Sequence, residues 1–135
     1  MTGLSELSAI VAAMPERSLL IVSGPKGVGK TRWARSLASA NIVDEPDVYG
    51  VLNSYPFGKD VLVIDNVKVG HARSSHRARF QAAITDLLHP VLEIRRNHRP
   101  SEFVTNTRKV VILTSDPLDW LSVPVVDISR IEVVA

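Results

Sequence analysis

The sequence predicts an α/β fold in which helices cover both faces of a mostly parallel sheet. Three runs of Val, Ile and Leu lie within 18–23, 60–66 and 109–116. Continuous apolar runs of this length are typical of strands buried on both faces, as in parallel sheets. Segments rich in helix formers alternate with these runs, and a glycine-rich loop follows the first of them. The chain has 135 residues, so we expect a single domain over residues 1–135.

The first elements form a helix–strand–helix series. Residues 4–14 carry apolar side chains at helical spacing, and this helix should end at the proline that follows. The strand at 18–23 leads through the glycine-rich loop into a predicted helix over 31–40, a segment without Pro or Gly. Residues 41–59 contain two prolines and two glycines, so we expect loops there, with one short strand near 41–44.

The middle of the chain predicts a second strand and a longer helix. Residues 60–66 read Asp-Val-Leu-Val-Ile-Asp-Asn, a buried strand that ends in an acid. Residues 67–76 are basic and contain a glycine, which favours a mobile loop. Apolar side chains then share one face over 77–88, and a proline follows shortly after, so we expect a helix in this range.

The last part of the chain predicts a hairpin and two further strands. Residues 91–95 and 101–105 are rich in β-formers and flank the basic tip Arg-Asn-His-Arg-Pro. The run at 109–116 is a third buried strand with polar residues at its exit, followed by a loop over 117–124. The segment 128–134 is expected to close the sheet.

Residues 24–31 match the pattern G-x-x-x-x-G-K-[ST] of a phosphate-binding P-loop. Its glycines permit backbone conformations that point N–H groups at a polyphosphate. Lys30 can reach the β- and γ-phosphates, and the Thr31 hydroxyl can bind Mg²⁺. The strand before the loop and the helix after it complete the context, since the helix N-terminus supplies an anion site. The predicted nucleotide-binding residues are Gly24, Pro25, Lys26, Gly27, Val28, Gly29, Lys30 and Thr31.

Polar residues end the other two apolar runs. Asp65 closes the second run, where its carboxylate would lie beside the phosphates and hold Mg²⁺ directly or through water. The alternative is an ordinary strand that ends in a turn-forming Asp. Thr114-Ser115-Asp116 closes the third run and either hydrogen-bonds the γ-phosphate or the attacking water, or simply starts a turn. Ligands of parallel sheets bind at the carboxyl ends of the strands, so these groups should meet the P-loop there.

Basic residues are concentrated in one part of a nearly neutral chain. The net charge is +2, but residues 66–99 hold seven Lys and Arg against two Asp and Glu, a local charge of +5. All four histidines lie in the same window. This block favours a surface that faces a polyanion such as nucleic acid, with a solvated helix face and a charged hairpin as the alternative. A zinc site is not indicated, because the chain has no Cys and no set of four ligands at suitable spacing.

The composition argues against a secreted or membrane-embedded protein. The absence of Cys excludes disulfides, and no apolar run is long enough to span a bilayer. The N-terminus does not show the basic stretch and apolar core of a secretory signal. We therefore expect a cytoplasmic protein without a membrane partner.

Over about residues 18–134, the chain resembles the superfamily 3 helicases, which include replication initiators of small single-stranded DNA viruses. The resemblance rests on the P-loop, the strand that ends at Asp65, a basic hairpin between the second and third motifs, and an apolar strand that ends in Thr-Ser. In that family, Pro, an acid, Trp and a later Arg-Ile often follow, and this chain has Pro117, Asp119-Trp120 and Arg130-Ile131 in the same order.

The resemblance implies a role for each matched position. Lys30 would contact the phosphates, Thr31 and Asp65 would bind Mg²⁺, and Asp116 would sense the γ-phosphate of ATP. Arg130 would be an arginine finger that reaches the nucleotide of a neighbour in a homo-oligomeric ring such as a hexamer, or it is only a solvated strand residue. Single-stranded DNA or RNA would be bound by the hairpin tip. The residues implied there are Arg95, Arg96, His98 and Arg99.

Two positions depart from the family pattern. The second motif usually ends in two acids, but the second is Asn66 here, and an amide cannot accept a proton from water. The Asn of the third motif is replaced by Asp116. Either the two positions have exchanged roles, or the protein is a weak or inactive ATPase, or the motifs are assigned differently.

Three functions follow as expectations. The first is an ATP- and Mg²⁺-dependent helicase-like motor on single-stranded nucleic acid in replication, with Lys30, Asp65, Asn66, Asp116 and Arg130 as the catalytic set. For a viral protein it would work in the cytoplasm or nucleus of the host cell. The second is a nucleotide-binding regulatory or assembly protein with little turnover. The third is a small nucleotide kinase. The sequence argues against it, because no arginine-rich lid is obvious.

Overall fold

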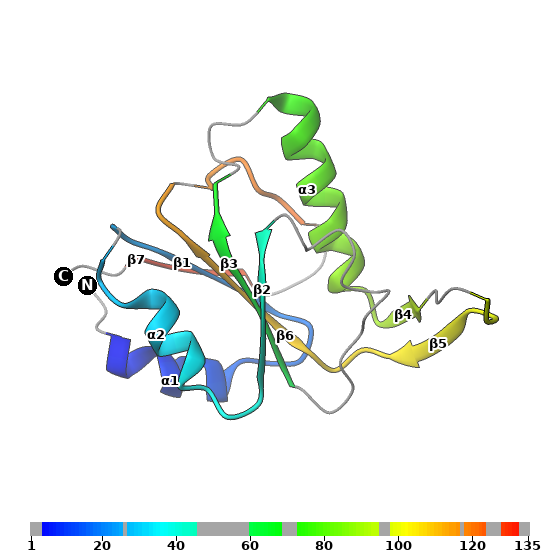
Figure 1. The fold of residues 1–135 in the computed structure, drawn as a ribbon, viewed down its shortest axis with the longest axis horizontal. Coiled ribbons are helices and arrows are strands. Elements are labelled where there is room, and N and C mark those ends of the chain that lie inside the picture. Colours follow the sequence, from blue (N-terminus) through cyan, green and yellow to red (C-terminus); the bar gives the residue numbers. More distant parts are fainter. Residues whose placement is uncertain are drawn as a thin grey trace.

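A computed structural model describes residues 4–25, 27–45, 60–68, 73–94, 98–116, 118–123 and 128–132. Its centre is a five-stranded sheet in the order β2-β3-β6-β1-β7 (Figure 1). All four neighbouring pairs in this sheet are parallel, which confirms the predicted α/β class. The strands are β1 (Leu19–Ser23), β2 (Ala40–Asp44), β3 (Val61–Val67), β6 (Lys109–Thr114) and β7 (Ile128–Glu132).

The order of the strands decides which loops meet. Strand β6 lies between β1 and β3, so the end of β6 is flanked by the P-loop on one side and by Asp65 on the other. Ser23 is the register partner of Thr114 on β6. The β3–β6 register shifts between Ile64 and Val67, which marks a bulge around Asp65 and Asn66. The predicted polar exits are therefore gathered at one edge of the sheet.

Two helices cover one face of the sheet. Helix α1 (Leu4–Ala13) and α2 (Lys30–Arg35) pack on it below the strands in Figure 1. Their buried residues join side chains that alternate along β1, β3 and β6, among them Leu20, Val63 and Val111. The two helices are also linked directly, because the Trp33 indole N–H donates to the Ser8 hydroxyl at 3.0 Å.

Helix α2 ends at Arg35, whereas the sequence predicted a helix up to residue 40. The chain turns early because residues from Ala40 onwards form β2, which pairs with β3. The carbonyl oxygen of Ser39 accepts hydrogen bonds from the backbone N–H groups of Asp60 and Val61, each at 3.1 Å. This pairing of β2 with β3 is a tertiary contact that overrides the local helix preference.

The opposite face is covered by α3 (Ser74–Leu87) and the segment 118–123. Phe80, Ile84 and Leu87 of the helix are buried against Leu62 and Ile112 of the sheet, among others. The helix begins three residues before the predicted position, so residues 74–76 are helical rather than part of a loop. Arg73 provides the first turn, since its carbonyl accepts from the backbone N–H of Arg77 at 3.0 Å.

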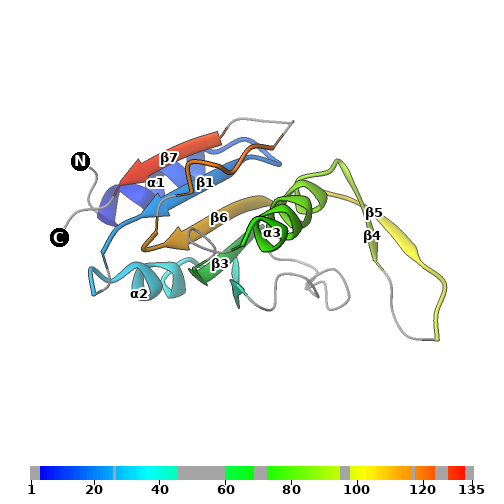
Figure 2. The ribbon, with the colours of Figure 1, turned by 90° about the horizontal axis from the view of Figure 1, so that it is seen from above.

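The predicted hairpin is present as a separate antiparallel pair, β4 (Val91–Ile94) and β5 (Glu102–Thr105). It extends away from the main sheet, as Figures 1 and 2 show. One face of the pair is anchored by the buried side chains of Leu92 and Ile94. On the other face, Val91 is 47% exposed and Phe103 is 71% exposed. The hairpin is therefore an arm whose solvent-exposed side carries two apolar side chains, Val91 and Phe103, beside Glu93 and Thr105.

Asn106 joins the arm to the body of the domain. Its side chain is fully buried and donates to the carbonyls of Leu87 at 2.7 Å and His89 at 2.9 Å. Its Oδ1 accepts from the backbone N–H of Arg108 at 3.1 Å. One amide thus satisfies three backbone groups at the junction of α3, the hairpin and β6. None of the helices in the described ranges is long and apolar enough to cross a membrane.

Candidate nucleotide-binding site

The P-loop connects the end of β1 to the start of α2. The backbone N–H of Gly24 donates to the carbonyl of Thr114 at 3.1 Å, which joins the loop to the end of β6. Gly27 and Gly29 have φ angles of +86° and +96°, a region that L side chains rarely adopt. The carbonyl of Gly29 then accepts from the N–H of Trp33 at 2.9 Å, the first turn of α2. Lys26 lies outside the described residues.

The ammonium group of Lys30 lies across the loop. Its Nζ donates to the carbonyl oxygens of Gly24 at 2.6 Å and Pro25 at 2.9 Å. Burial lowers the pKa of Lys30 below its ordinary value of 10.5, and the nearby carboxylate of Asp65 opposes that shift. A phosphate in the loop would replace two neutral carbonyls by an anion and would stabilise the charged form of the lysine.

Thr31 and Asp65 form the polar centre of the site. The Thr31 hydroxyl donates to Oδ2 of Asp65 at 2.7 Å, and the other carboxylate oxygen, Oδ1, accepts from the backbone N–H of Asn66 at 2.8 Å. Asp65 is only 5% exposed. A hydroxyl and a carboxylate are hard oxygen donors of the type that Mg²⁺ prefers, and their oxygens already converge. The donor set therefore fits a magnesium ion held between the two side chains.

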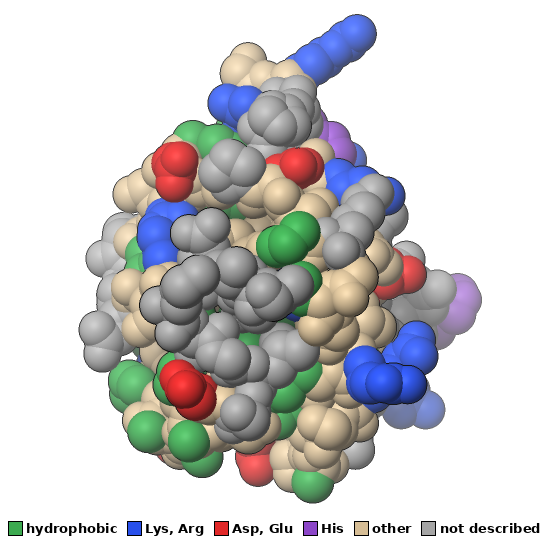
Figure 3. Space-filling view, turned by 90° about the vertical axis from the view of Figure 1, so that its left-hand side faces the viewer, with side chains coloured by type: hydrophobic (Ala, Val, Ile, Leu, Met, Phe, Trp, Pro, Cys, Tyr) green, Lys and Arg blue, Asp and Glu red, His purple; other side chains and the backbone are tan. Residues whose placement is uncertain are grey.

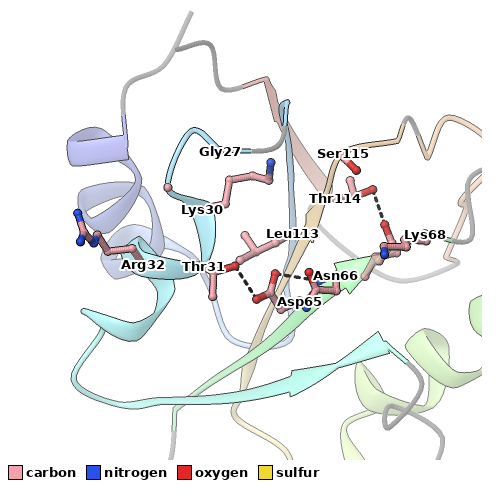
Figure 4. Close-up of a pocket in the computed structure, with 12 residues that line it drawn as sticks. Gly27, Lys30, Thr31, Arg32, Asp65, Asn66, Lys68, Leu113, Thr114 and Ser115 are labelled. Atoms are coloured by element: carbon pink, nitrogen blue, oxygen red, sulfur yellow. Dashed lines mark hydrogen bonds between the residues drawn. The ribbon is translucent and has the colours of Figure 1, made fainter.

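A pocket of about 420 Å³ lies over these residues (Figure 4). It is bounded by the P-loop, the start of α2 and the ends of β3 and β6. In Figure 4, the Lys30 ammonium points towards the loop, whereas the Arg32 guanidinium is turned away from Asp65. The lining residues are Gly27, Gly29, Lys30, Thr31, Arg32, Asp65, Asn66, Val67, Lys68, Leu113, Thr114 and Ser115.

Four lining residues were not predicted to belong to the site: Arg32, Val67, Lys68 and Leu113. Arg32 and Lys68 are exposed cations, and Lys68 lies at the end of β3, across the pocket from Gly27 in Figure 4. For Lys68, a signal was present in the sequence, because it follows Asp65 by only three positions. The register shift after Ile64 decides which of the following residues face the pocket, and a sequence pattern does not reveal it.

The residues at the end of β6 divide between them the two roles that the sequence left open. The Thr114 hydroxyl is buried and lies 2.9 Å from the carbonyl of Val67 and 2.8 Å from that of Asp116. It also accepts from the backbone N–H of Asp116 at 3.0 Å. Thr114 therefore joins β6 to β3 and stabilises the turn. Ser115 lines the pocket and Asp116 does not.

Asn66 is held in an unusual conformation beside Asp65. Its φ is +54°, in the left-handed region, which asparagine tolerates better than most residues. Its side-chain Nδ2 donates to Oδ1 of Asp44, at the end of β2, at 3.0 Å. The amide is thus turned towards the neighbouring strand while the residue still lines the pocket.

Arg130 lies away from this pocket and binds its own chain. It pairs in register with Ile21, two residues before the end of β1. Its guanidinium donates to the carbonyls of Leu118 and Leu121, both at 2.8 Å. The arginine-finger role implied by the resemblance stays a prediction, and it would require both hydrogen bonds to break.

The basic residues and histidines of the segment 66–99 lie in different parts of the structure. Arg95 and Arg96 lie outside the described residues, and His98 and Arg99 are exposed near the tip of the arm. The Arg77 guanidinium instead stacks over the Trp120 ring, 5.4 Å from its centroid, so it is part of the packing of α3. Figure 3 shows the face at the left of Figure 1, on which Lys and Arg side chains lie in separate groups with Asp and Glu between them.

Two solved structures are similar in fold to this chain, and both are of the NrS-1 C-terminal region. The A form apo structure matches with a TM-score of 0.59 and 14% identity, over 96% of this chain and 32% of that chain. A second A form apo structure, of residues 305–718, matches with a TM-score of 0.55 and 17% identity over the same shares. No family model matches the chain, and no curated protein matches it.

The similarity shows the fold. This chain spans about a third of the length of those two structures. Together with the parallel sheet and the loop between β1 and α2, the similarity is consistent with a P-loop NTPase-like core.

Proposed function

We propose that this chain is a helicase-like ATPase domain that binds ATP with Mg²⁺ and acts on single-stranded nucleic acid. The observation that supports it best is the 2.7 Å hydrogen bond between Thr31 and Asp65, directly below the P-loop. A chance glycine loop would not place a buried carboxylate from a distant strand against the hydroxyl of the motif. The fold similarity to the NrS-1 C-terminal region is in keeping with this assignment.

The residues of the site divide the work of binding. Left-handed Gly27 and Gly29 let the loop wrap the phosphates. Lys30 exchanges its two carbonyl partners for phosphate oxygens, which brings a positive charge to the γ-phosphate. Thr31 and Asp65 would hold Mg²⁺, which neutralises the charge that develops on the phosphates during hydrolysis.

Nucleotide binding is tested by titrating ATP with Mg²⁺ into the wild type and Lys30→Ala in a calorimeter. We expect loss of measurable binding in the variant. Arg79→Ala is a suitable control, because Arg79 is an exposed cation on α3, on the opposite face of the sheet. Undiminished binding by Lys30→Ala would remove the basis for the P-loop assignment.

The hairpin arm is the proposed contact with single-stranded nucleic acid. Exposed His98 and Arg99 lie near its tip, and the exposed Phe103 ring lies on β5. Cationic groups bind phosphates and an exposed aromatic ring stacks with bases, which is the usual combination in single-strand binding. Binding of a fluorescent oligonucleotide, measured at several salt concentrations, tests this contact.

Self-assembly into a ring is the second part of the proposal. Light scattering of the chain alone, with a non-hydrolysable ATP analogue, and with the analogue plus single-stranded DNA would measure it. A ring that forms only with the ligands would support a motor. A monomer under all three conditions would contradict assembly as part of the mechanism.

A nucleotide-binding regulatory protein with little turnover is the second candidate, and two observations favour it. The Asn66 amide cannot take a proton, and the Arg130 guanidinium is bonded to its own chain. Phosphate release from a preformed ATP–Mg²⁺ complex in a single turnover separates the two candidates. Binding without release would favour the regulatory protein.

A further inference from the structure

Asn66 stands where the resemblance leads us to expect a catalytic acid. Asn66 is at the bulge of β3, with φ of +54°, and its Nδ2 donates to Oδ1 of Asp44 at 3.0 Å. A carboxylate is therefore in direct contact with the residue that lacks one. The sequence does not predict this, because 22 positions separate the two residues.

Asp44 is held next to Asp65 by the sheet itself. The two residues are register partners on the parallel neighbours β2 and β3, which places their backbones about 5 Å apart. Side chains of register partners point to the same face, and here that face carries α2. Ile42, two positions before Asp44, packs in the cluster on the α2 side. Asp44 is exposed, so its carboxylate is accessible to water.

A second pocket, of about 460 Å³, opens in front of this carboxylate. It is lined by Asp44, Arg35 and neighbouring residues of β2, and it shares Thr31, Asp65 and Asn66 with the nucleotide pocket. The shared residues make the two pockets contiguous. A water molecule in the second pocket would lie between Asp44 and the side of the nucleotide pocket that holds the Thr31–Asp65 pair.

A chain of hydrogen bonds runs from β2 through β3 to the start of α2. Asp44 accepts from Asn66, the Asn66 backbone N–H donates to Asp65, and Asp65 accepts from Thr31. Because Asn66 uses its Nδ2 to bind Asp44, its Oδ1 is the side-chain atom that remains to accept a hydrogen bond from water. The Asn66 amide oxygen, which can accept a hydrogen bond, and the Asp44 carboxylate are therefore held next to each other.

Other acids near this edge are less suitable. Glu45 follows Asp44 but is 8% exposed and lies 3.2 Å from the His76 ring, on α3. Asp116 lines neither pocket. Among the described residues, Asp44 and Asp65 are the acids that line one or both pockets, and Asp65 is already bonded to Thr31.

We propose that Asp44 is the catalytic base of this ATPase and that Asn66 positions the attacking water for it. The proposal rests on the hydrolysis proposed above. The water oxygen forms a bond to the γ-phosphorus while the bond between that phosphorus and the β,γ-bridging oxygen breaks. The proton of the water passes to the Asp44 carboxylate, and the products are ADP and inorganic phosphate. The missing acid of β3 is thus supplied by β2.

The test compares single-turnover phosphate release from ATP–Mg²⁺ in the wild type and Asp44→Asn, with single-stranded DNA in every reaction. The new amide can still accept from Asn66 through its oxygen, so the variant removes the base and keeps the hydrogen bond. We expect release to slow at least about 100-fold. The affinity for ADP–Mg²⁺ and the melting temperature should stay close to those of the wild type. Asp119→Asn, at an exposed acid away from both pockets, is the matched control.

A charge swap gives a second, independent readout. Asp44→Asn combined with Asn66→Asp exchanges the two side chains and returns an acid to the same contact. We expect the double variant to recover at least about tenfold over Asp44→Asn, since the base then lies on β3. A structural role of Asp44 alone would not produce this recovery.

Each outcome decides between the proposals. Release by Asp44→Asn within about threefold of the wild type overturns the role of Asp44 and leaves the ATPase proposal intact. A loss of ADP–Mg²⁺ affinity that matches the loss of rate, or a swap no faster than Asp44→Asn, also overturns it. A wild type that binds ATP and releases no phosphate overturns the hydrolysis proposal itself, and the role of Asp44 with it.

Discussion

The hydroxyl of Thr31 donates a 2.7 Å hydrogen bond to Oδ2 of Asp65, although 34 positions separate the two residues in the chain. The bond joins the first turn of α2 to the end of β3 across the end of β6. It brings together the two oxygen donors that would hold Mg²⁺ in the proposed function.

We expect Asp65→Asn to weaken ATP binding in the presence of Mg²⁺ by roughly 10- to 100-fold. An amide keeps the size of the side chain but removes the charge that attracts the metal. ATP binding measured by calorimetry with Mg²⁺ and with excess chelator checks this. Thr31→Ser, which keeps the hydroxyl, should bind as the wild type does. An equal loss for Asp65→Asn with and without Mg²⁺ would contradict a metal-binding role.

ATP binding should be coupled to proton uptake at alkaline pH. Burial holds the pKa of Lys30 below 10.5 in the free protein, and bound phosphates would raise it again. At a pH between the pKa of Lys30 in the free protein and its pKa in the ATP complex, the free lysine is partly neutral and the bound lysine is charged. Binding of ATP therefore takes up a proton. The ATP affinity must then fall as the pH rises through this window.

Calorimetry at alkaline pH in two buffers of different ionisation enthalpy measures this uptake. Lys30→Arg is the matched control, because an arginine stays charged throughout this range. If its ATP affinity falls with pH as steeply as that of the wild type, the proton is taken up by another group.

Two substitutions in the hairpin arm should change different properties of single-strand binding, one the affinity and the other its salt dependence. Phe103→Ala should lower the affinity by roughly 5- to 150-fold, equivalent to about 1–3 kcal/mol, with the salt dependence unchanged. Arg99→Ala should instead reduce the slope of log affinity against log salt by about 0.7, the value of one phosphate contact. Fluorescence anisotropy of a labelled oligonucleotide at four or more salt concentrations separates the two. Val91→Ala, on the same exposed face, is the control for lost apolar surface.

Replacing Asn106 should destabilise the whole domain. Asn106→Ala leaves the carbonyls of Leu87 and His89 and the N–H of Arg108 without their present partner in a buried place. We expect a loss of about 2–4 kcal/mol in the free energy of unfolding. Urea denaturation measures it, and Thr107→Ala, at the exposed neighbouring position, should lie within about 0.5 kcal/mol of the wild type. Equal stability of the two variants would show that water replaces the amide.

Short-range patterns in the sequence predict most of the helices and strands and the phosphate loop. Continuous Val, Ile and Leu runs have no polar face, so the strands that became β1, β3 and β6 had to be buried on both sides. The three glycines of the P-loop, Gly24, Gly27 and Gly29, predicted backbone conformations that a side chain would block, and Gly27 and Gly29 have positive φ whereas Gly24 does not. Two β-forming arms around a polar tip predicted the hairpin. Each of these features is encoded within a few neighbouring residues.

Which of these elements lie side by side follows from the packing of the whole domain. Strand order places β6 between β1 and β3, and it places β2 beside β3, so that Asp44 contacts Asn66. The same packing bonds Arg130 to the 118–121 segment and stacks Arg77 on Trp120, although both had the charge expected of a binding residue. The spacing of apolar residues, two in a strand and 3.6 in a helix, indicates which face of the element is buried. It does not indicate which other element packs against that face. The neighbours depend on contacts between residues far apart in the chain.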